Sequence, residues 1–236
     1  MGEPLVLLPG MMCDARVFAP QINALSRDMP VTIAPVTQGE RIEELASAIL
    51  PLLPARFALA GLSMGGIVAM EILRRAPERV TRIALMDTNP LAETPQTSAA
   101  YEPLIVGARS GRLDEMLRQV LRPEHLAPGP GRLAVLSQLA EMGRDLGAEV
   151  FVRQIRALQR RRDQQSTLRK ITVPTLILCG EHDTLTPPRR HSFMADLIPY
   201  AKLEIIAGAG HIPTLERPDI VTRALRAWMR QPYVLK

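Results

Sequence analysis

Aromatic residues, cysteines and long apolar runs are all scarce in this sequence, and each shortage argues against a class of protein. Aromatic side chains make up 3% of the 236 residues, and no basic stretch is interleaved with them. A nucleic-acid-binding surface is therefore not expected. No apolar run reaches the length of about 18 residues that a membrane-spanning helix needs. The first four residues, Met1-Gly2-Glu3-Pro4, lack the basic segment of a signal peptide. Together these shortages predict a cytoplasmic protein that binds neither nucleic acid nor membrane.

The two cysteines, Cys13 and Cys179, each lie beside an apolar segment. Two such thiols in a cytosolic protein are expected to be buried and reduced. No group of cysteine and histidine residues has the spacing of a metal site, so no metal ion is expected. The net charge of +5 at pH 7 allows a mild attraction to anionic partners. The sequence does not determine the oligomeric state, and a homodimer is one option.

What the chain has in abundance is apolar sequence in alternating patterns. Hydrophobic residues make up 47% of it, which is enough for a sizeable core in one large domain. Short apolar runs, typical of parallel strands buried on both faces, occur at 5–8, 31–36, 57–62, 82–87, 173–180 and 203–206. Helical spacing of apolar residues occurs at 17–27, 40–50, 64–76, 187–197 and 218–230. The alternation predicts an α/β protein with about six mostly parallel strands flanked by helices.

The alternation stops between residues 91 and 170, where no strand is expected. Leu113, Met116, Leu117 and Val120 recur at helical spacing, and two similar sets follow at 133–142 and 151–158. Proline and glycine residues separate these sets. We therefore predict a helical cap of three or four helices at 91–170, inserted into a core domain formed by 1–90 and 171–236.

One stretch combines a strand, a sharp turn and a helix around a serine. Its turn reads Gly61-x-Ser63-x-Gly65 and is followed by Gly66. The glycines give room for the strained backbone that the serine needs, and they let the helix start close to the sheet. The helix N-terminus beneath Ser63 favours developing negative charge. This context predicts that Ser63 is a nucleophile.

A serine hydroxyl needs a base within hydrogen-bond reach. Of the four histidines, His211 follows the last predicted strand and therefore lies at the same sheet edge as Ser63. His125 falls in the helical insertion, His191 on a helix, and His182 beside an acidic residue. We therefore assign the general base to His211.

The base needs a carboxylate that orients its ring. Asp87 and Asp183 both end strands at the correct edge, and both fit the chain order Ser, Asp, His. Asp183 is favoured because its strand directly precedes that of His211, so the two are expected to be neighbours. Asp87 is better explained as a cap on the segment that follows it.

The oxyanion of an acyl-transfer reaction needs preorganised N–H donors. We expect one from the backbone of Met64, directly after the nucleophile, and the other from Met11 in the loop after the first strand. Met12 and Leu62 are the predicted pocket side chains. Methionines around Ser63 suit an apolar acyl pocket, although ordinary core packing explains these side chains equally well.

These motifs resemble those of the α/β-hydrolase superfamily over essentially the whole chain. The matching segments are Leu-Leu-Pro-Gly-Met at 7–11, Gly-Leu-Ser-Met-Gly-Gly at 61–66, Val173 to Asp183, and Gly208 to Pro218. Within the superfamily the chain is similar to small carboxylesterases and enol-lactonases, which share the elbow sequence. Two departures stand out. Pro9 replaces the histidine that many relatives have before the oxyanion glycine, and the family's leading hairpin is absent.

The leading functional hypothesis is a serine hydrolase of small carboxylic esters or lactones. Ser63 attacks the carbonyl, His211 transfers the proton, Asp183 orients His211, and water hydrolyses the acyl-enzyme. This chemistry requires no cofactor. Two alternatives stay open: a lyase or carbon–carbon bond hydrolase with the same triad, and a non-catalytic ligand receptor on the same fold. Ser63 in place of aspartate argues against the dehalogenases and epoxide hydrolases of this superfamily.

Seven basic residues crowd the end of the predicted cap. They are Arg153, Arg156, Arg160, Arg161, Arg162, Arg169 and Lys170. A solvated helix face is the simpler explanation. The alternative is that some of them face the entrance and attract an anionic acyl group or an acidic carrier.

Overall fold

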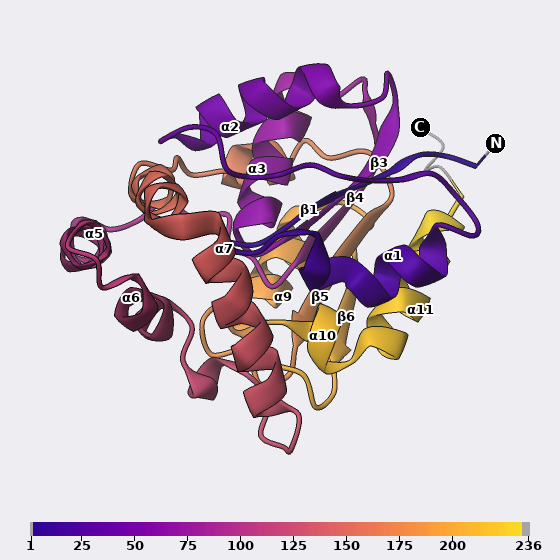
Figure 1. Cartoon of the computed structure of the whole chain (residues 1–236). Coiled ribbons are helices and arrows are strands. Elements are labelled where there is room, and N and C mark those ends of the chain that lie inside the picture. The colour runs from indigo at the N-terminus through magenta and orange to yellow at the C-terminus, as the bar shows by residue number, and fades with distance from the viewer. Residues whose placement is uncertain (1, 233–236) are drawn as a thin grey trace.

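The computed structural model describes residues 2–232 and is built on one parallel sheet (Figure 1). Its six strands are β1 (Leu5–Leu8), β2 (Val31–Ile33), β3 (Phe57–Leu62), β4 (Val80–Met86), β5 (Thr175–Gly180) and β6 (Lys202–Ile206). They are arranged in the order β2-β1-β3-β4-β5-β6, and every adjacent pair is parallel. The predicted α/β fold with a sheet of six parallel strands is confirmed.

Burial explains why the central strands are apolar runs. Every residue of β1, β3, β4 and β5 is buried, as expected of parallel strands that helices cover on both faces. The edge strands differ. In β6 an ion pair of 2.6 Å joins Lys202 to Glu204, and such charges discourage pairing with another chain. Strand β2 ends at Ile33, earlier than predicted, because Pro35 has no N–H to donate to a ladder.

Helices cover both faces of the sheet. One face packs against α2 (Ile42–Ile49), α3 (Met64–Arg75) and α9 (Pro188–Leu197). The other packs against the 3₁₀ turn η1 (Ala15–Phe18) and the helices α1 (Ala19–Leu25), α10 (Pro213–Glu216) and α11 (Pro218–Met229). Another 3₁₀ turn, η2 (Leu50–Leu52), ends α2. Among the described residues, no helix is both long and apolar enough to cross a membrane.

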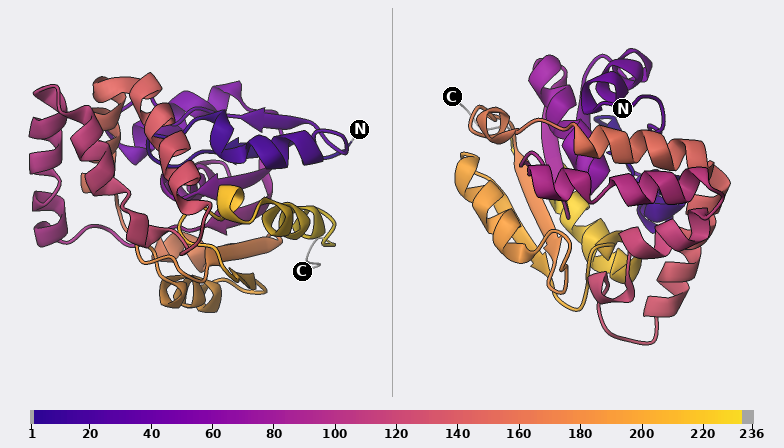
Figure 2. Two further views of the ribbon diagram at one scale, coloured as in Figure 1. Left: turned by 60° about the horizontal axis from the view of Figure 1, so that its bottom comes forward. Right: turned by 90° about the vertical axis from the view of Figure 1, so that its left-hand side faces the viewer.

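The chain between β4 and β5 is helical, and most of its helices form a group at one end of the sheet (Figure 2), whereas α8 (Gln165–Leu168) packs against α3 and α9. Its elements are α4 (Pro95–Ala99), α5 (Glu102–Arg109), α6 (Leu113–Val120), the 3₁₀ turn η3 (Pro123–His125), α7 (Arg132–Gln159) and α8. Residues 87–174, all of them described, contain no strand. There are more helices than predicted, since α4 has five residues and α8 has four, too few to show a clear apolar period. The division into core and cap stays a prediction.

A change of direction at Gly147 divides α7 into two halves. Gly147 has φ 82° and ψ 170°, which is a left-handed backbone that glycine adopts without strain. A Cβ at this position would meet no atom within 4 Å, so glycine is required here for its conformation and not for space. The two helices predicted on either side of this glycine are these two halves.

A buried carboxylate ties α3 to the end of the helical segment. Glu71 accepts hydrogen bonds from Arg74 at 2.7 Å, Arg75 at 2.6 Å and Gln164 at 3.0 Å. Burial by itself raises the pKa of Glu71, but the hydrogen bonds outweigh it and lower that pKa to about 2. Glu71 is therefore an ionised group with its partners built around it.

Candidate active site

The serine elbow has the predicted strand, turn and helix. Ser63 lies between β3 and α3 with φ 53° and ψ −116°, a strained backbone for a residue with a side chain. A Cβ at Gly65 would collide with the Leu8 carbonyl, and one at Gly61 with the Gly65 backbone. The Thr88 hydroxyl donates to the Ser63 carbonyl oxygen at 2.7 Å and holds the turn. Ser63 is therefore presented at the carboxyl edge of the sheet.

Three predicted site residues meet there. The Ser63 Oγ lies 2.9 Å from Nε2 of His211, and Nδ1 of His211 lies 2.9 Å from Oδ2 of Asp183. His211 is 3% exposed and Asp183 is 2% exposed. With the ring proton on Nδ1 facing the carboxylate, Nε2 is free to accept the serine proton. The assignment of these roles to the three residues stays a prediction.

The Asp183 carboxylate is held by more donors than His211 alone. Oδ1 accepts the backbone N–H of Leu185 at 2.8 Å and of Thr186 at 2.9 Å, and Oδ2 accepts the Thr186 hydroxyl at 2.6 Å. Burial raises the pKa of Asp183, but the charge and hydrogen bond of His211, together with Thr186, lower it to about 2. Asp183 is therefore ionised across the neutral pH range.

The loop that carries His211 is fastened by one acidic side chain. Glu216 accepts the backbone N–H of Gly210 and of Ile212, each at 3.0 Å, and that of Ala127 at 2.7 Å. Sequence reasoning included Glu216 in a family motif but gave it no role. The structure places it where it fixes the backbone on both sides of the histidine.

The other three histidines have different surroundings. His191 is buried, and its Nε2 accepts the backbone N–H of Thr88 at 3.0 Å. Burial lowers the pKa of His191 to about 4, so its ring is neutral. The Nδ1 of His125 pairs with the Thr184 hydroxyl at 2.8 Å. His182 is exposed beside an acid. None of them contacts Ser63.

The predicted oxyanion donors stay free in the part of the chain that the structure describes. The backbone N–H groups of Met11 and Met64 make no hydrogen bond to another protein group there. The loop after β1 also packs closely against the nucleophile, since a Cβ on Gly10 would lie 3.4 Å from the Ser63 Cβ. Unpaired N–H groups beside a serine nucleophile can donate hydrogen bonds to the oxyanion that forms during acyl transfer.

A glutamine in the helical segment holds this loop, and sequence reasoning missed it. Gln154 of α7 is 1% exposed. Its Oε1 accepts the backbone N–H of Met12 at 2.9 Å, and its Nε2 donates to the Val36 carbonyl at 2.6 Å. Met12 itself has φ 54°. A polar residue among the apolar positions of a predicted helix is the only sequence signal that could have suggested such a role.

Ser63 and His211 line a large cavity of about 960 Å³ that the helical segment covers. Met11, Met12 and Met64 line it too. Leu62 does not lie there. It is fully buried in the core below the site, packed with Leu5 and Leu7. Strand residues point alternately to opposite faces, so the neighbour of an exposed nucleophile can point into the core.

Polar groups of the helical segment form one part of the cavity wall. Arg161 pairs with Glu93 at 2.7 Å, their side chains being 9% and 10% exposed. Arg161 also donates to the Leu91 carbonyl at 2.9 Å, and the Tyr101 hydroxyl donates to Glu93 at 3.1 Å. The charge of Arg161 is thus neutralised where it faces the cavity.

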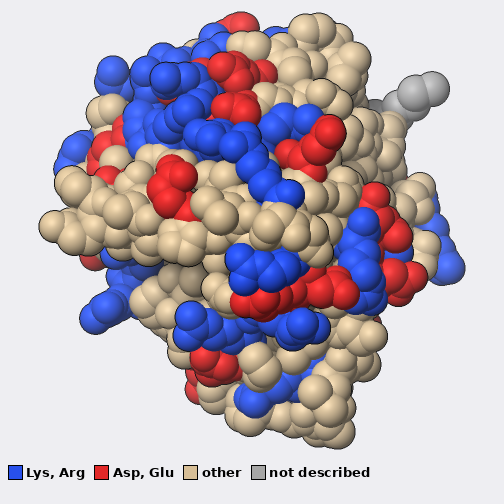
Figure 3. Space-filling model, turned by 60° about the vertical axis from the view of Figure 1, so that its left-hand side comes forward, with Lys and Arg blue, Asp and Glu red and all other residues tan. Residues whose placement is uncertain are grey.

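Most of the other basic residues in the predicted cluster bind acids outside the cavity. Arg156 and Arg160 both reach Glu40, at 3.8 Å and 3.4 Å, and Arg162 reaches Glu43 at 2.8 Å. On the face drawn in Figure 3, Asp and Glu atoms lie among the gathered Lys and Arg atoms. These arginines join the helical segment to the α2 region.

The geometry of the site defines a class: an α/β protein with a serine, histidine and aspartate at the carboxyl edge of its sheet. A family model described as alpha/beta hydrolase fold matches residues 42–218, and this chain belongs to that family. It is 27% identical over 201 residues to a pimeloyl-(acyl-carrier protein) methyl ester esterase of Aromatoleum aromaticum, covering 77% of each sequence.

Solved structures agree on the fold. An enol-lactonase from Burkholderia xenovorans LB400 superimposes with a TM-score of 0.87 at 25% identity, covering 98% of this chain and 92% of the other. A thermophilic esterase from Thermogutta terrifontis gives a TM-score of 0.88 at 24% identity, covering 98% and 90%. At 24% identity, the likeness to the Thermogutta esterase shows a shared fold only.

Proposed function

We propose that this protein hydrolyses carboxylic esters or lactones through an acyl-enzyme on Ser63. The observation that carries the proposal is the unbroken chain from the Ser63 Oγ through His211 to Asp183, with 2.9 Å at each step, opening into the covered cavity. A non-catalytic ligand receptor would need the cavity, but it would not need the hydrogen-bonded chain from Ser63 through His211 to Asp183. The esterase named among the relatives supports the same activity.

The proposed reaction follows from the positions of the groups. The Ser63 hydroxyl attacks the substrate carbonyl while its proton moves to Nε2 of His211. The Met11 and Met64 N–H groups stabilise the negative oxygen of the tetrahedral intermediate. His211 then gives the proton to the departing alkoxide, and water repeats the sequence to release the acid and restore Ser63. Asp183 stays ionised and stabilises the imidazolium.

The cavity wall supports a neutral, apolar acyl group as the substrate. Methionines surround Ser63, and three of the four arginines that line the cavity are paired with acids: Arg161 with Glu93, Arg144 with Asp114 and Arg122 with Glu124, while Arg118 is the fourth. A cavity of about 960 Å³ has room for a chain of medium length, since ligand pockets usually measure about 300–1,000 Å³. We propose that residues 91–170 act as a cap that selects this chain, because α4 to α7 contribute much of the lining.

Turnover of chromogenic esters and lactones tests the proposal. The wild-type protein is expected to hydrolyse p-nitrophenyl esters of short and medium neutral acids, and Ser63→Ala to lower kcat by about 10⁴ or more. Ser137→Ala is the matched control, because Ser137 lines the same cavity and, unlike Ser63, forms no hydrogen bond to a histidine within residues 2–232. A fluorophosphonate should label Ser63 alone. Equal turnover by Ser63→Ala, or products of carbon–carbon cleavage, would contradict ester hydrolysis.

A further inference from the structure

Asp87 is a buried carboxyl group for which the proposed mechanism has no use. It follows β4 directly, with φ 44°, and is fully buried. It does not cap the segment that follows it, as the sequence suggested. Instead, its Oδ1 accepts the backbone N–H of Gly180, at the end of β5, at 2.9 Å. Its Oδ2 is buried without a hydrogen-bond partner among the described residues.

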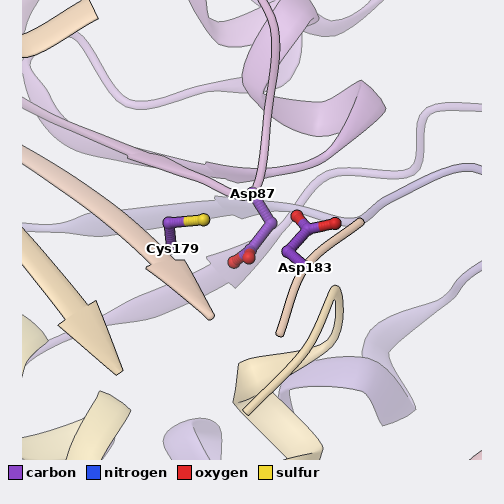
Figure 4. A group of neighbouring side chains, drawn as sticks. All are labelled: Asp87, Cys179 and Asp183. Carbon is purple, nitrogen blue, oxygen red and sulfur yellow. The ribbon is translucent and has the colours of Figure 1, made fainter. Parts of the chain in front are cut away.

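The Asp87 carboxyl group lies beside that of Asp183 (Figure 4). One carboxyl oxygen of Asp87, one of Asp183 and the Sγ of Cys179 all lie within 4.8 Å of one another. Burial raises the pKa of Asp87 well above its usual range, and the charge of Asp183 raises it further. Two neighbouring buried carboxyl groups cannot both carry a full charge, so one proton is shared by the pair.

Hydrogen-bond donors decide which of the two holds the proton. Asp183 accepts from the His211 ring, the Thr186 hydroxyl and two backbone N–H groups. Asp87 accepts from one backbone N–H. Donors favour the ionised form of the group they reach. Asp183 is therefore the anion, and Asp87 is the acid.

A metal ion fits this cluster less well than a proton does. The Asp183 oxygens are already occupied by the donors named above. The Cys179 thiol donates to the carbonyls of Gly180 at 3.3 Å and Thr186 at 3.6 Å. Burial is the main cause that raises the pKa of Cys179, so it is not the thiolate that binds metals.

We propose that Asp87 is a neutral carboxylic acid whose O–H donates to the Asp183 carboxylate, which makes it a positioning residue for the hydrolytic site. This inference rests on the proposed function of Asp183. The donated bond holds Asp183 in the orientation that meets His211. The other titratable groups around the pair are Cys179, His125, His191, His211 and Glu216. The charge of Glu216 also favours the protonated form of Asp87.

Two substitutions of Asp87 test whether its role is to donate a hydrogen bond to Asp183. Asp87→Asn keeps a donor toward Asp183 and an acceptor for Gly180, whereas Asp87→Leu removes both. We expect Asp87→Leu to lower kcat by about 10-fold or more with little change in KM, and Asp87→Asn to recover most of that loss. Equal kcat losses in the two variants would overturn the donor role.

The pH profile tests the protonation state directly. The acidic limb of kcat/KM reports protonation of the base. If Asp87 is neutral, Asp87→Asn leaves this limb within about 0.2 pH unit of the wild type. If Asp87 carries a charge, the substitution removes a negative neighbour of the imidazolium, and the limb moves to lower pH. That movement would overturn the proposal.

Unfolding provides a test that needs no ester turnover, so it separates this inference from the proposed function. Folding raises the pKa of Asp87 above its value of about 3.8 in the unfolded chain. A carboxyl of this kind contributes most to the stability of the fold below pH 3.8. It loses that contribution as the pH rises toward its pKa in the folded protein. The Tm of Asp87→Asn relative to the wild type is therefore expected to increase between pH 5 and pH 8. A constant Tm difference would overturn the proposal even if Asp87→Leu fails to fold.

Discussion

Gln154 Oε1 accepts the backbone N–H of Met12 at 2.9 Å and thereby ties the helical segment to the loop that carries the Met11 N–H. The two residues are 142 positions apart in the chain. A segment that covers the cavity therefore also supports the proposed oxyanion site. The first prediction follows from this contact.

Gln154→Leu is expected to lower kcat by about 10-fold or more, because the loop that should donate to the oxyanion loses its anchor. Its stability should also fall by about 1–3 kcal/mol, since the Met12 N–H and Val36 carbonyl lose their partners. Gln164→Leu is the matched control. Gln164 is equally buried but bonds Glu71 and Thr167, away from the loop. Steady-state kinetics and urea unfolding measure both effects, and equal kcat losses in the two variants would refute the anchor role.

Asp183→Asn is expected to lower kcat by about 10⁴-fold, because the amide favours the wrong tautomer of His211. The fold should persist, since the substitution is isosteric. Asp145→Asn serves as a control for loss of a carboxylate, as Asp145 is exposed and pairs with Arg16 at 2.6 Å. Single-turnover kinetics with a p-nitrophenyl ester measure the chemical step. A larger loss in Asp87→Asn than in Asp183→Asn would place the acid on the earlier strand.

Glu93→Gln is expected to change the preference for substrate charge. It removes the negative partner of Arg161 at the cavity wall, so a substrate carboxylate meets an unpaired cation. The kcat/KM for an ester whose acyl chain ends in a carboxylate should rise about tenfold relative to a neutral ester of equal length. Glu149→Gln, which removes a 93% exposed carboxylate paired with Arg153, should leave kcat/KM for both esters unchanged. An unchanged ratio in Glu93→Gln would mean that acyl chains do not reach this wall.

Glu71→Gln is expected to destabilise the protein at neutral pH by about 1–3 kcal/mol, because charged hydrogen bonds in the interior are lost. The folded pKa of Glu71 is about 2, below the ordinary value of 4.5. Its contribution to stability is therefore present above pH 4.5 and lost as pH falls toward 2. Urea unfolding at pH 7 and pH 3 should show a smaller difference at the lower pH. Glu115→Gln, in an exposed pair with Arg112, should change stability by less than about 0.5 kcal/mol at either pH.

Local patterns were enough to find the elbow, the strand ends and the residues that meet there. Ser63 is marked by glycines that its turn requires, and Asp183 and His211 follow strands whose apolar runs are unmistakable. Parallel strands bring their carboxyl ends to one edge, so sequence position alone placed these residues near one another. The apolar runs also predicted about six strands, and the six-stranded sheet confirms this number.

Groups that act through distant partners were not predictable. Gln154 reads as an ordinary helix residue until Met12 and Val36 are folded against it. Asp87 had a local explanation as a cap, and only the position of β5 shows that it faces Asp183 instead. Leu62 was predicted to line the pocket, although strand geometry turns it into the core. In all three residues, contacts with segments distant in the sequence determine where the side chain lies.

The bend at Gly147 lets the two halves of α7 run in different directions. The half before it contributes Leu136 and Leu139 to the cavity, and the half after it carries Gln154 and Leu158. Both halves therefore reach the cavity, and the second half also holds the loop after β1 through Gln154. Because Gly147 breaks the helix between them, the first half can change its side chains or its length while the second half keeps its register and its Gln154 contact to Met12.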